Sequence, residues 1–141
     1  MSMQMTVSFK NQLEEIERLG QIVTEFAQRH HWSSHLLFEV NVALEELLTN
    51  VISYAYEDNN EHDIILRLSF TDGEVTAELE DDGRPFNPLE AAEPDVNTPL
   101  EDRPVGGLGI YLARKFMTDM SYKRQEEKNL LILKKTVKEE H

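Results

Sequence analysis

The chain lacks cysteine and long apolar runs, and each absence excludes a class of protein. Without cysteine there is neither a disulfide framework nor a thiolate metal site. No stretch approaches the roughly 18 consecutive apolar residues that a membrane-spanning helix needs. The first ten residues, MSMQMTVSFK, also lack the apolar core of a signal peptide. We therefore expect a cytoplasmic protein without a membrane segment.

Basic residues are scarce as well. The chain has 14 Lys and Arg against 27 Asp and Glu, a net charge of −13. Phosphate contacts need clustered Lys and Arg, so nucleic acid is not expected as a partner. If the ligand is a polyanion such as ATP, a divalent metal, helix-start amides and a few arginines must supply local positive potential.

Proline is rare and concentrated in one place. Residues 84–105 hold all five prolines and show no periodicity. An unstructured loop of about 20 residues is unusual in a compact domain and often marks a functional lid. The alternative is a surface excursion without a function.

At 141 residues the chain is long enough for one compact domain, 1–141, and too short for two. Alternation over Thr6–Phe9 predicts a short first strand. Apolar residues at helical spacing then predict a helix over 12–30. Asn11, with Glu14 three residues later, has the pattern of a capping box at its start.

The rest of the chain continues this alternation of helices and strands. The patterns predict, in order, a helix over 35–55 capped by Ser33 or Ser34, a β-hairpin from Ile64 to Asp81, a helix from about Leu108 to Asp119, and strands at Tyr122–Gln125 and Leu130–Val137 around a turn at Glu127–Asn129. The order β-α-α-β-β-loop-α-β-β predicts an α/β two-layer sandwich. The expected sheet is a mixed sheet in which most strand pairs are antiparallel, and three helices cover one of its faces.

The second helix carries polar residues beside its apolar stripe. At 100° per residue, Glu39, Glu46 and Asn50 fall within about 40° of one another, whereas Glu45 points towards solvent. An Asn oxygen near phosphate oxygens suits Mg²⁺. A carboxylate one turn away could accept a proton from a hydroxyl that attacks a phosphoryl group. The alternative is a solvated helix flank.

A second candidate group lies in EDDGRPFNP. Asp81 shares a strand face with apolar residues, so it points into the helix-covered layer, where an unpaired carboxylate is costly. The exocyclic amine of a purine is a suitable partner for it. Gly83 allows the backbone to approach a flat ring closely. The alternative is a strand-end Asp in a DDG turn.

The third group is the glycine-rich segment in RPVGGLGIYLARKFM. Gly106, Gly107 and Gly109 offer unobstructed amides where a helix start favours phosphate. The segment is neither a P-loop nor a dinucleotide fingerprint, because GxxxxGK[ST] is absent and no strand runs directly into it. The alternative is a flexible hinge.

The histidines give no metal pattern. His30, His31, His35 and His62 lack metal-site spacing and are expected at the surface or as caps. Trp32 is expected to anchor neighbouring helices.

In this order, the three segments resemble the N box, G1 box and G2 box of the GHKL (Bergerat-fold) ATPase and kinase superfamily. The closest likeness is to its stand-alone branch, the anti-sigma-factor serine/threonine protein kinases of bacterial partner-switching systems, and it covers nearly the whole chain. The resemblance implies that Glu46 is the catalytic base and that Asn50 binds Mg²⁺. The nucleotide-binding positions it indicates are Asn50, Asp81, Gly83, Gly106, Gly107, Leu108 and Gly109. Arg84 and Arg103 are the expected cations near the phosphates, and Arg103 is preferred for the γ-phosphate because it precedes the glycine turn.

The resemblance also implies a function. Such a protein binds ATP and Mg²⁺, sequesters a partner such as a sigma factor, and phosphorylates a serine or threonine of a STAS-type antagonist. Some members of the family are homodimers. Two alternatives stay open: a nucleotide-dependent protein-binding module without kinase turnover, and a weak ATPase that acts on water.

Overall fold

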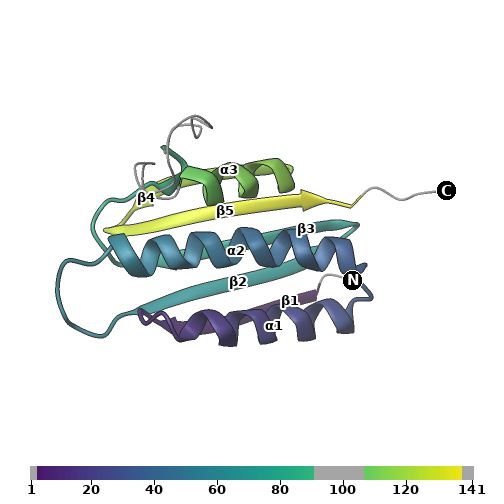
Figure 1. Cartoon of the computed structure of the whole chain (residues 1–141), viewed down its shortest axis with the longest axis horizontal. Coiled ribbons are helices and arrows are strands. Elements are labelled where there is room, and N and C mark those ends of the chain that lie inside the picture. The colour runs from purple at the N-terminus through teal and green to yellow at the C-terminus, as the bar shows by residue number, and fades with distance from the viewer. Residues whose placement is uncertain (1–2, 91–106, 138–141) are drawn as a thin grey trace.

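The computed structural model describes residues 3–90 and 107–137, and Figure 1 shows the arrangement of its helices and strands. In chain order the elements are β1 (Met3–Lys10), α1 (Glu15–Arg29), α2 (Ser34–Tyr54), β2 (Asp63–Thr71), β3 (Glu74–Asp81), the short 3-10 helix η1 (Pro88–Glu90), α3 (Gly107–Phe116), β4 (Asp119–Gln125) and β5 (Lys128–Thr136).

The five strands form one sheet in the order β1-β2-β3-β5-β4. The three helices lie together on one face of this sheet, with α2 between α1 and α3 (Figure 1). The predicted two-layer α/β sandwich is therefore confirmed. The expected mixed sheet is wrong for the described strands, because all four pairings are antiparallel. The two helices between β1 and β2 each reverse the chain, so these strands run in opposite directions.

The core lies between the sheet and α2. Along β3, alternate residues are buried from Val75 to Asp81, as the hairpin pattern predicts. Helix α2 is packed against both other helices and buries residues on several sides, including the polar Glu39 and Asn50. Each fully buried leucine contributes about 1.5–3 kcal/mol, which fixes α2 and the residues it carries.

The predicted start of α1 is wrong. The helix begins at Glu15, and its N-cap residue, Glu14, makes no capping hydrogen bond through its side chain. Asn11 instead accepts a hydrogen bond from the His62 backbone N–H at 2.8 Å and donates to the Asn60 carbonyl at 3.2 Å. The Asn11 side chain thus ties the end of β1 to the loop before β2, and is not available as a cap.

Other boundaries differ by a few residues. The Ser33 hydroxyl accepts the Leu36 N–H at 3.1 Å, which confirms the predicted cap of α2. The turn between β4 and β5 uses Glu126 and Glu127, both with positive φ, as in the two-residue turns that match strand twist. This turn lies earlier than predicted, so Asn129 belongs to β5 and not to the turn.

The predicted lid, 84–105, is described only up to residue 90, where the segment forms η1. There Arg114 of α3 donates to the Leu89 carbonyl, which fixes η1 against that helix. The remainder of the lid lies outside the described residues. None of the helices that the structure describes is both long and apolar enough to cross a membrane.

Candidate functional site

Glu46 and Asn50 are in direct contact on α2. Asn50 Nδ2 donates to the Glu46 backbone carbonyl at 2.7 Å and to Glu46 Oε1 at 2.9 Å. Asn50 is buried, with 4% of its surface exposed. Since Nδ2 makes both bonds, the amide is oriented and its Oδ1 is the atom presented to a hard cation such as Mg²⁺. The residues present therefore fit the expected metal.

The first turn of α3 packs against this pair. A Cβ atom built on Gly109 would lie 1.9 Å from Glu46 Cδ, so only glycine leaves room for the carboxylate there. Helix α3 begins at Gly107, and a helix N-terminus favours phosphate oxygens because its first N–H groups have no partner within the helix. The structure thus brings the first and third sequence segments together.

Asp81 lies at the end of β3 with 3% of its surface exposed. Its Oδ1 accepts hydrogen bonds from Asn129 Nδ2 and from the Gly83 N–H, both at 2.9 Å. Burial raises the pKa of the Asp81 carboxyl, and these two donors oppose the rise. The carboxylate is therefore held in one orientation, which suits it to recognise a single hydrogen-bond donor of a ligand.

Asn129 is the residue that the sequence prediction missed. It is completely buried at the start of β5, on the same strand face as Leu131 and Leu133. Its side-chain amide makes hydrogen bonds with five groups. The oxygen Oδ1 accepts from Tyr122 Oη (2.5 Å), Arg124 Nη1 (3.2 Å) and the Phe86 N–H (3.3 Å). The nitrogen Nδ2 donates to Asp81 Oδ1 (2.9 Å) and to the Arg84 carbonyl (2.8 Å). Strand alternation would have revealed it if the preceding turn had been placed correctly.

Gly83 makes its close approach to the end of α2. A Cβ atom at this position would lie 2.5 Å from the Ala55 carbonyl oxygen, which also accepts the Arg84 N–H at 2.8 Å. The Arg84 side chain donates to the Tyr54 carbonyl at 2.9 Å and pairs with Glu57 at 3.1 Å. Arg84 is therefore engaged at the C-terminus of α2. The other expected cation, Arg103, lies outside the described residues, as does Gly106.

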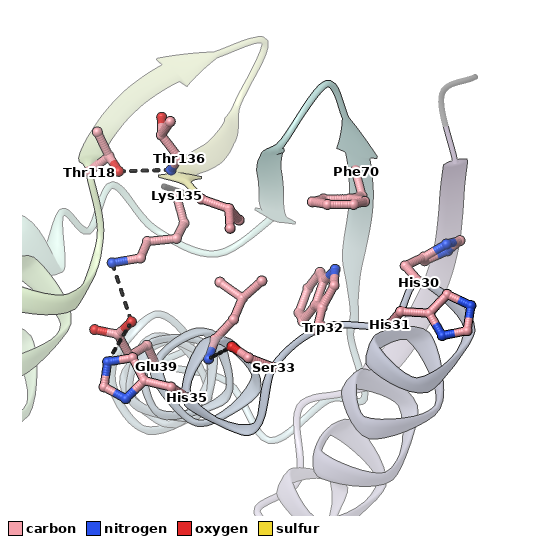
Figure 2. Close-up of a pocket in the computed structure, with 12 residues that line it drawn as sticks. His30, His31, Trp32, Ser33, His35, Glu39, Phe70, Thr118, Lys135 and Thr136 are labelled. Carbon is pink, nitrogen blue, oxygen red and sulfur yellow. Dashed lines mark hydrogen bonds and ion pairs between the residues drawn. The ribbon is translucent and has the colours of Figure 1, made fainter. Parts of the chain in front are cut away.

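Glu39 does not join Glu46, although helical phase placed the two on one edge. Glu39 lines a cavity of about 840 Å³ near the N-terminus of α2. Figure 2 shows its side chain there, beside those of His35 and Lys135. Glu39 is buried there and pairs with Lys135 at 3.3 Å and with His35 at 3.4 Å. Lys135 also donates to the Phe116 carbonyl at 2.6 Å, so it links α2 with the last turn of α3. This cavity lies at the opposite end of α2 from Asn50.

Glu45 does not point into solvent as predicted. It is partly buried, accepts a hydrogen bond from Asn41 Nδ2 at 3.2 Å, and lies beside Gly20 of α1. The packing of α1 on this side of α2 accounts for the difference. Trp32 packs edge-on against Phe26 and Phe70, as expected of an anchor, although it joins α1 to a strand and not to a second helix.

The described residues contain no cluster of three or more His, Asp or Glu side chains arranged to hold a metal ion. Among these residues a cation at Asn50 would have water and phosphate oxygens as its further ligands, which is the usual pattern for Mg²⁺ at nucleotides.

Comparison with known proteins identifies the family. A family profile described as the histidine kinase-like ATPase domain matches residues 9–135. The chain belongs to this family. The match includes α2, the end of β3 and the start of α3, so it contains all three segments from which the family was predicted.

The curated relatives of this histidine kinase-like domain include protein kinases. Serine/threonine-protein kinase BtrW of Bordetella bronchiseptica is 35% identical over 107 residues, which cover 76% of this chain and 75% of that protein. Serine-protein kinase RsbW of Bacillus cereus is 31% identical over 99 residues, covering 68% and 62%. Anti-sigma F factor of Clostridium botulinum is 28% identical over 90 residues, covering 64% and 63%.

These relatives confirm the predicted class, an ATP-dependent serine/threonine protein kinase of the anti-sigma-factor type. A crystal structure of the RsbU and RsbW domains of a Mycobacterium tuberculosis protein has the same fold, with a TM-score of 0.69 and 12% identity. The comparison covers 95% of this chain and 32% of that one, and at this identity it supports the fold alone.

Proposed function

We propose that the protein transfers the γ-phosphoryl group of ATP to a serine or threonine of a protein partner, with Glu46 as the general base. One observation carries this proposal. Glu46, Asn50 and the first turn of α3 meet at one point, so a base, a metal ligand and phosphate-binding amides are combined. Phosphoryl transfer depends mainly on such positioning and on charge stabilisation.

Each segment has a proposed task. Asp81, held by Asn129, accepts a hydrogen bond from the exocyclic amine of adenine. Gly83, packed against Ala55, forms part of the wall of this adenine pocket. Asn50 Oδ1 binds Mg²⁺, which when bound neutralises charge on the phosphates. The backbone of Gly106, Gly107, Leu108 and Gly109 holds the phosphate oxygens, with Arg103 as the added cation.

The proton transfer follows from the Glu46 geometry. Its Oε1 is held by Asn50 Nδ2 at 2.9 Å, which fixes the plane of the carboxylate. The second oxygen, Oε2, takes the proton of the attacking hydroxyl, while the hydroxyl oxygen of the partner's serine or threonine forms a bond to phosphorus. The bond between phosphorus and the ADP oxygen breaks, and ADP leaves.

The partners are proposed from the relatives and from the family resemblance. We propose a STAS-type antagonist as the phosphorylated protein and a sigma factor as the sequestered one, with the chain acting as a homodimer in the cytoplasm. Residues 1–141 would form a single ATP-binding domain, in which residues 84–105 act as the lid.

The decisive experiment incubates the protein with Mg²⁺, γ-labelled ATP and a panel of STAS-domain proteins. We expect label on a serine or threonine of one of them. Glu46→Gln should slow the transfer by about 100- to 10,000-fold and keep ATP binding, whereas Asn50→Ala should weaken Mg²⁺-dependent binding. ATP binding without transfer to any partner would instead support a nucleotide-dependent binding module. Phosphate release without a partner, lost in Asn50→Ala, would support a weak ATPase.

A further inference from the structure

His62, just before β2, stands between two carboxylates. Its Nε2 lies 2.8 Å from Asp58 Oδ1, and its Nδ1 lies 3.2 Å from Asp82 Oδ1. A neutral imidazole has one N–H donor and one acceptor, so it cannot donate to both carboxylates. Only the protonated ring satisfies both contacts. We name this group, Asp58, His62 and Asp82, the His62 clamp.

The imidazole is held in place from other directions. The Tyr56 ring stacks on it, with centroids 4.4 Å apart and an interplanar angle of 21°. The His62 backbone is fixed to Asn11 at the end of β1, because the His62 N–H donates to Asn11 Oδ1 and the His62 carbonyl accepts the Asn11 N–H. With 18% of its side chain exposed, the ring has little freedom to turn away.

The clamp connects two parts of the nucleotide site. Asp58 belongs to the loop that follows α2, the helix that carries Asn50. Asp82 lies between Asp81 and Gly83, the residues proposed at the adenine. Arg84 also joins this loop to the turn, through the Ala55 carbonyl and Glu57. Opening the clamp would therefore remove one of several links and loosen the wall of the adenine pocket without releasing it.

We propose that His62 is a positioning residue for the nucleotide site: its protonated ring holds the loop after α2 on the turn at Asp82, and ATP affinity falls when the ring loses its proton. This inference rests on the proposed ATP site. When only a fraction of the molecules have the conformation that binds the ligand, the apparent affinity is reduced by that fraction.

The surrounding charges set the direction of the effect. The titratable and charged groups near the ring come from three parts of the chain. The loop contributes Tyr56, Glu57 and Asp58, and the segment after β3 contributes Asp82 and Arg84. Strand β2 contributes Asp63, which is paired with Lys10 of β1. The contact with Asp58, and then that with Asp82, raises the pKa of His62 above its ordinary value of 6.5. The clamp is therefore complete below pH 6.5 and is lost as pH rises through the raised pKa.

The test measures ATP binding by calorimetry between pH 5.5 and 8.5 at constant ionic strength. For the unmodified chain we expect the affinity to fall roughly three- to tenfold across the titration of His62. His62→Gln should remove this dependence, because an amide does not titrate and carries no positive charge to attract the two carboxylates. Its affinity should match the high-pH value of the unmodified chain.

A matched control is available in His35. It also faces a carboxylate four residues along the chain, Glu39 at 3.4 Å, but it lies at the other end of α2. His35→Gln should therefore keep the full pH dependence.

A second variant, Asp82→Asn, removes one carboxylate from the clamp. NMR should then show that His62 titrates at lower pH, and the pH profile of ATP affinity should move in the same direction.

The outcomes separate the two proposals. ATP binding with the same pH profile in the unmodified chain and in His62→Gln would overturn this inference and leave the proposed function standing. A His62 midpoint unmoved in Asp82→Asn would also overturn it. If the unmodified chain binds no ATP at any pH, the proposed function fails and this inference fails with it.

Discussion

The contact between Gly109 and Glu46 makes a quantitative prediction. In Gly109→Ala, the new methyl group would lie 1.9 Å from Glu46 Cδ, whereas ordinary van der Waals contact begins near 3.4 Å. The carboxylate must therefore move by about 1.5 Å, away from its hydrogen bond with Asn50, and a catalytic group misplaced by about 1 Å costs about 100-fold in rate. We expect transfer to the partner to slow about 100-fold, equivalent to about 2.7 kcal/mol in the barrier.

The fold should tolerate this change. The group displaced is the end of a flexible side chain, and Gly109 does not have positive φ, so alanine fits the helix. Alanine also favours a helix by about 1 kcal/mol relative to glycine. Stability in urea should therefore stay within about 1 kcal/mol of the unmodified protein, and ATP affinity should change little.

Single-turnover transfer of labelled phosphate is the assay, with ATP affinity measured in parallel. The control is Gly109→Ala combined with Glu46→Gln. Because both changes act on one carboxylate, the double variant should be no slower than Glu46→Gln alone. A transfer rate within threefold of the unmodified protein in Gly109→Ala, or additive losses in the double variant, would refute the reasoning.

Three further predictions use the same contacts. In Gly83→Ala the methyl group meets the Ala55 carbonyl at 2.5 Å, and because backbone cannot move aside cheaply, urea unfolding should show a loss of about 1–3 kcal/mol or more. Gly20→Ala in α1 meets nothing closer than 3.7 Å, so the same measurement should show a gain of about 0.5–1 kcal/mol. Asn129→Ala removes a donor from Asp81 and leaves buried partners unpaired, at about 1–3 kcal/mol for each such group. Calorimetry should then show weakened ATP binding, and unchanged affinity would count against the proposed role of Asp81.

Much of the fold was predictable because its patterns are local. The alternation along β2 and β3 and the apolar stripe of α2 gave the hairpin and the helix, since side-chain direction follows from strand and helix geometry. The same rule placed Asp81 facing inwards and set Glu46 and Asn50 one turn apart. Local pattern failed where a side chain has a distant partner, as at Asn11, which binds His62 and not the start of α1.

The sequence by itself therefore determined the family, the strand and helix order, and which residues carry polar chemistry. The tertiary structure decided which of them meet. Glu39 and Glu46 share an edge of α2 by helical phase, yet only Glu46 faces Gly109, while Glu39 is drawn to Lys135 of β5. The support of Asp81 by Asn129, 48 residues away, and the contact of Gly83 with Ala55 likewise depend on packing between elements. Such contacts join residues far apart in the chain, so no periodicity in the sequence reports them.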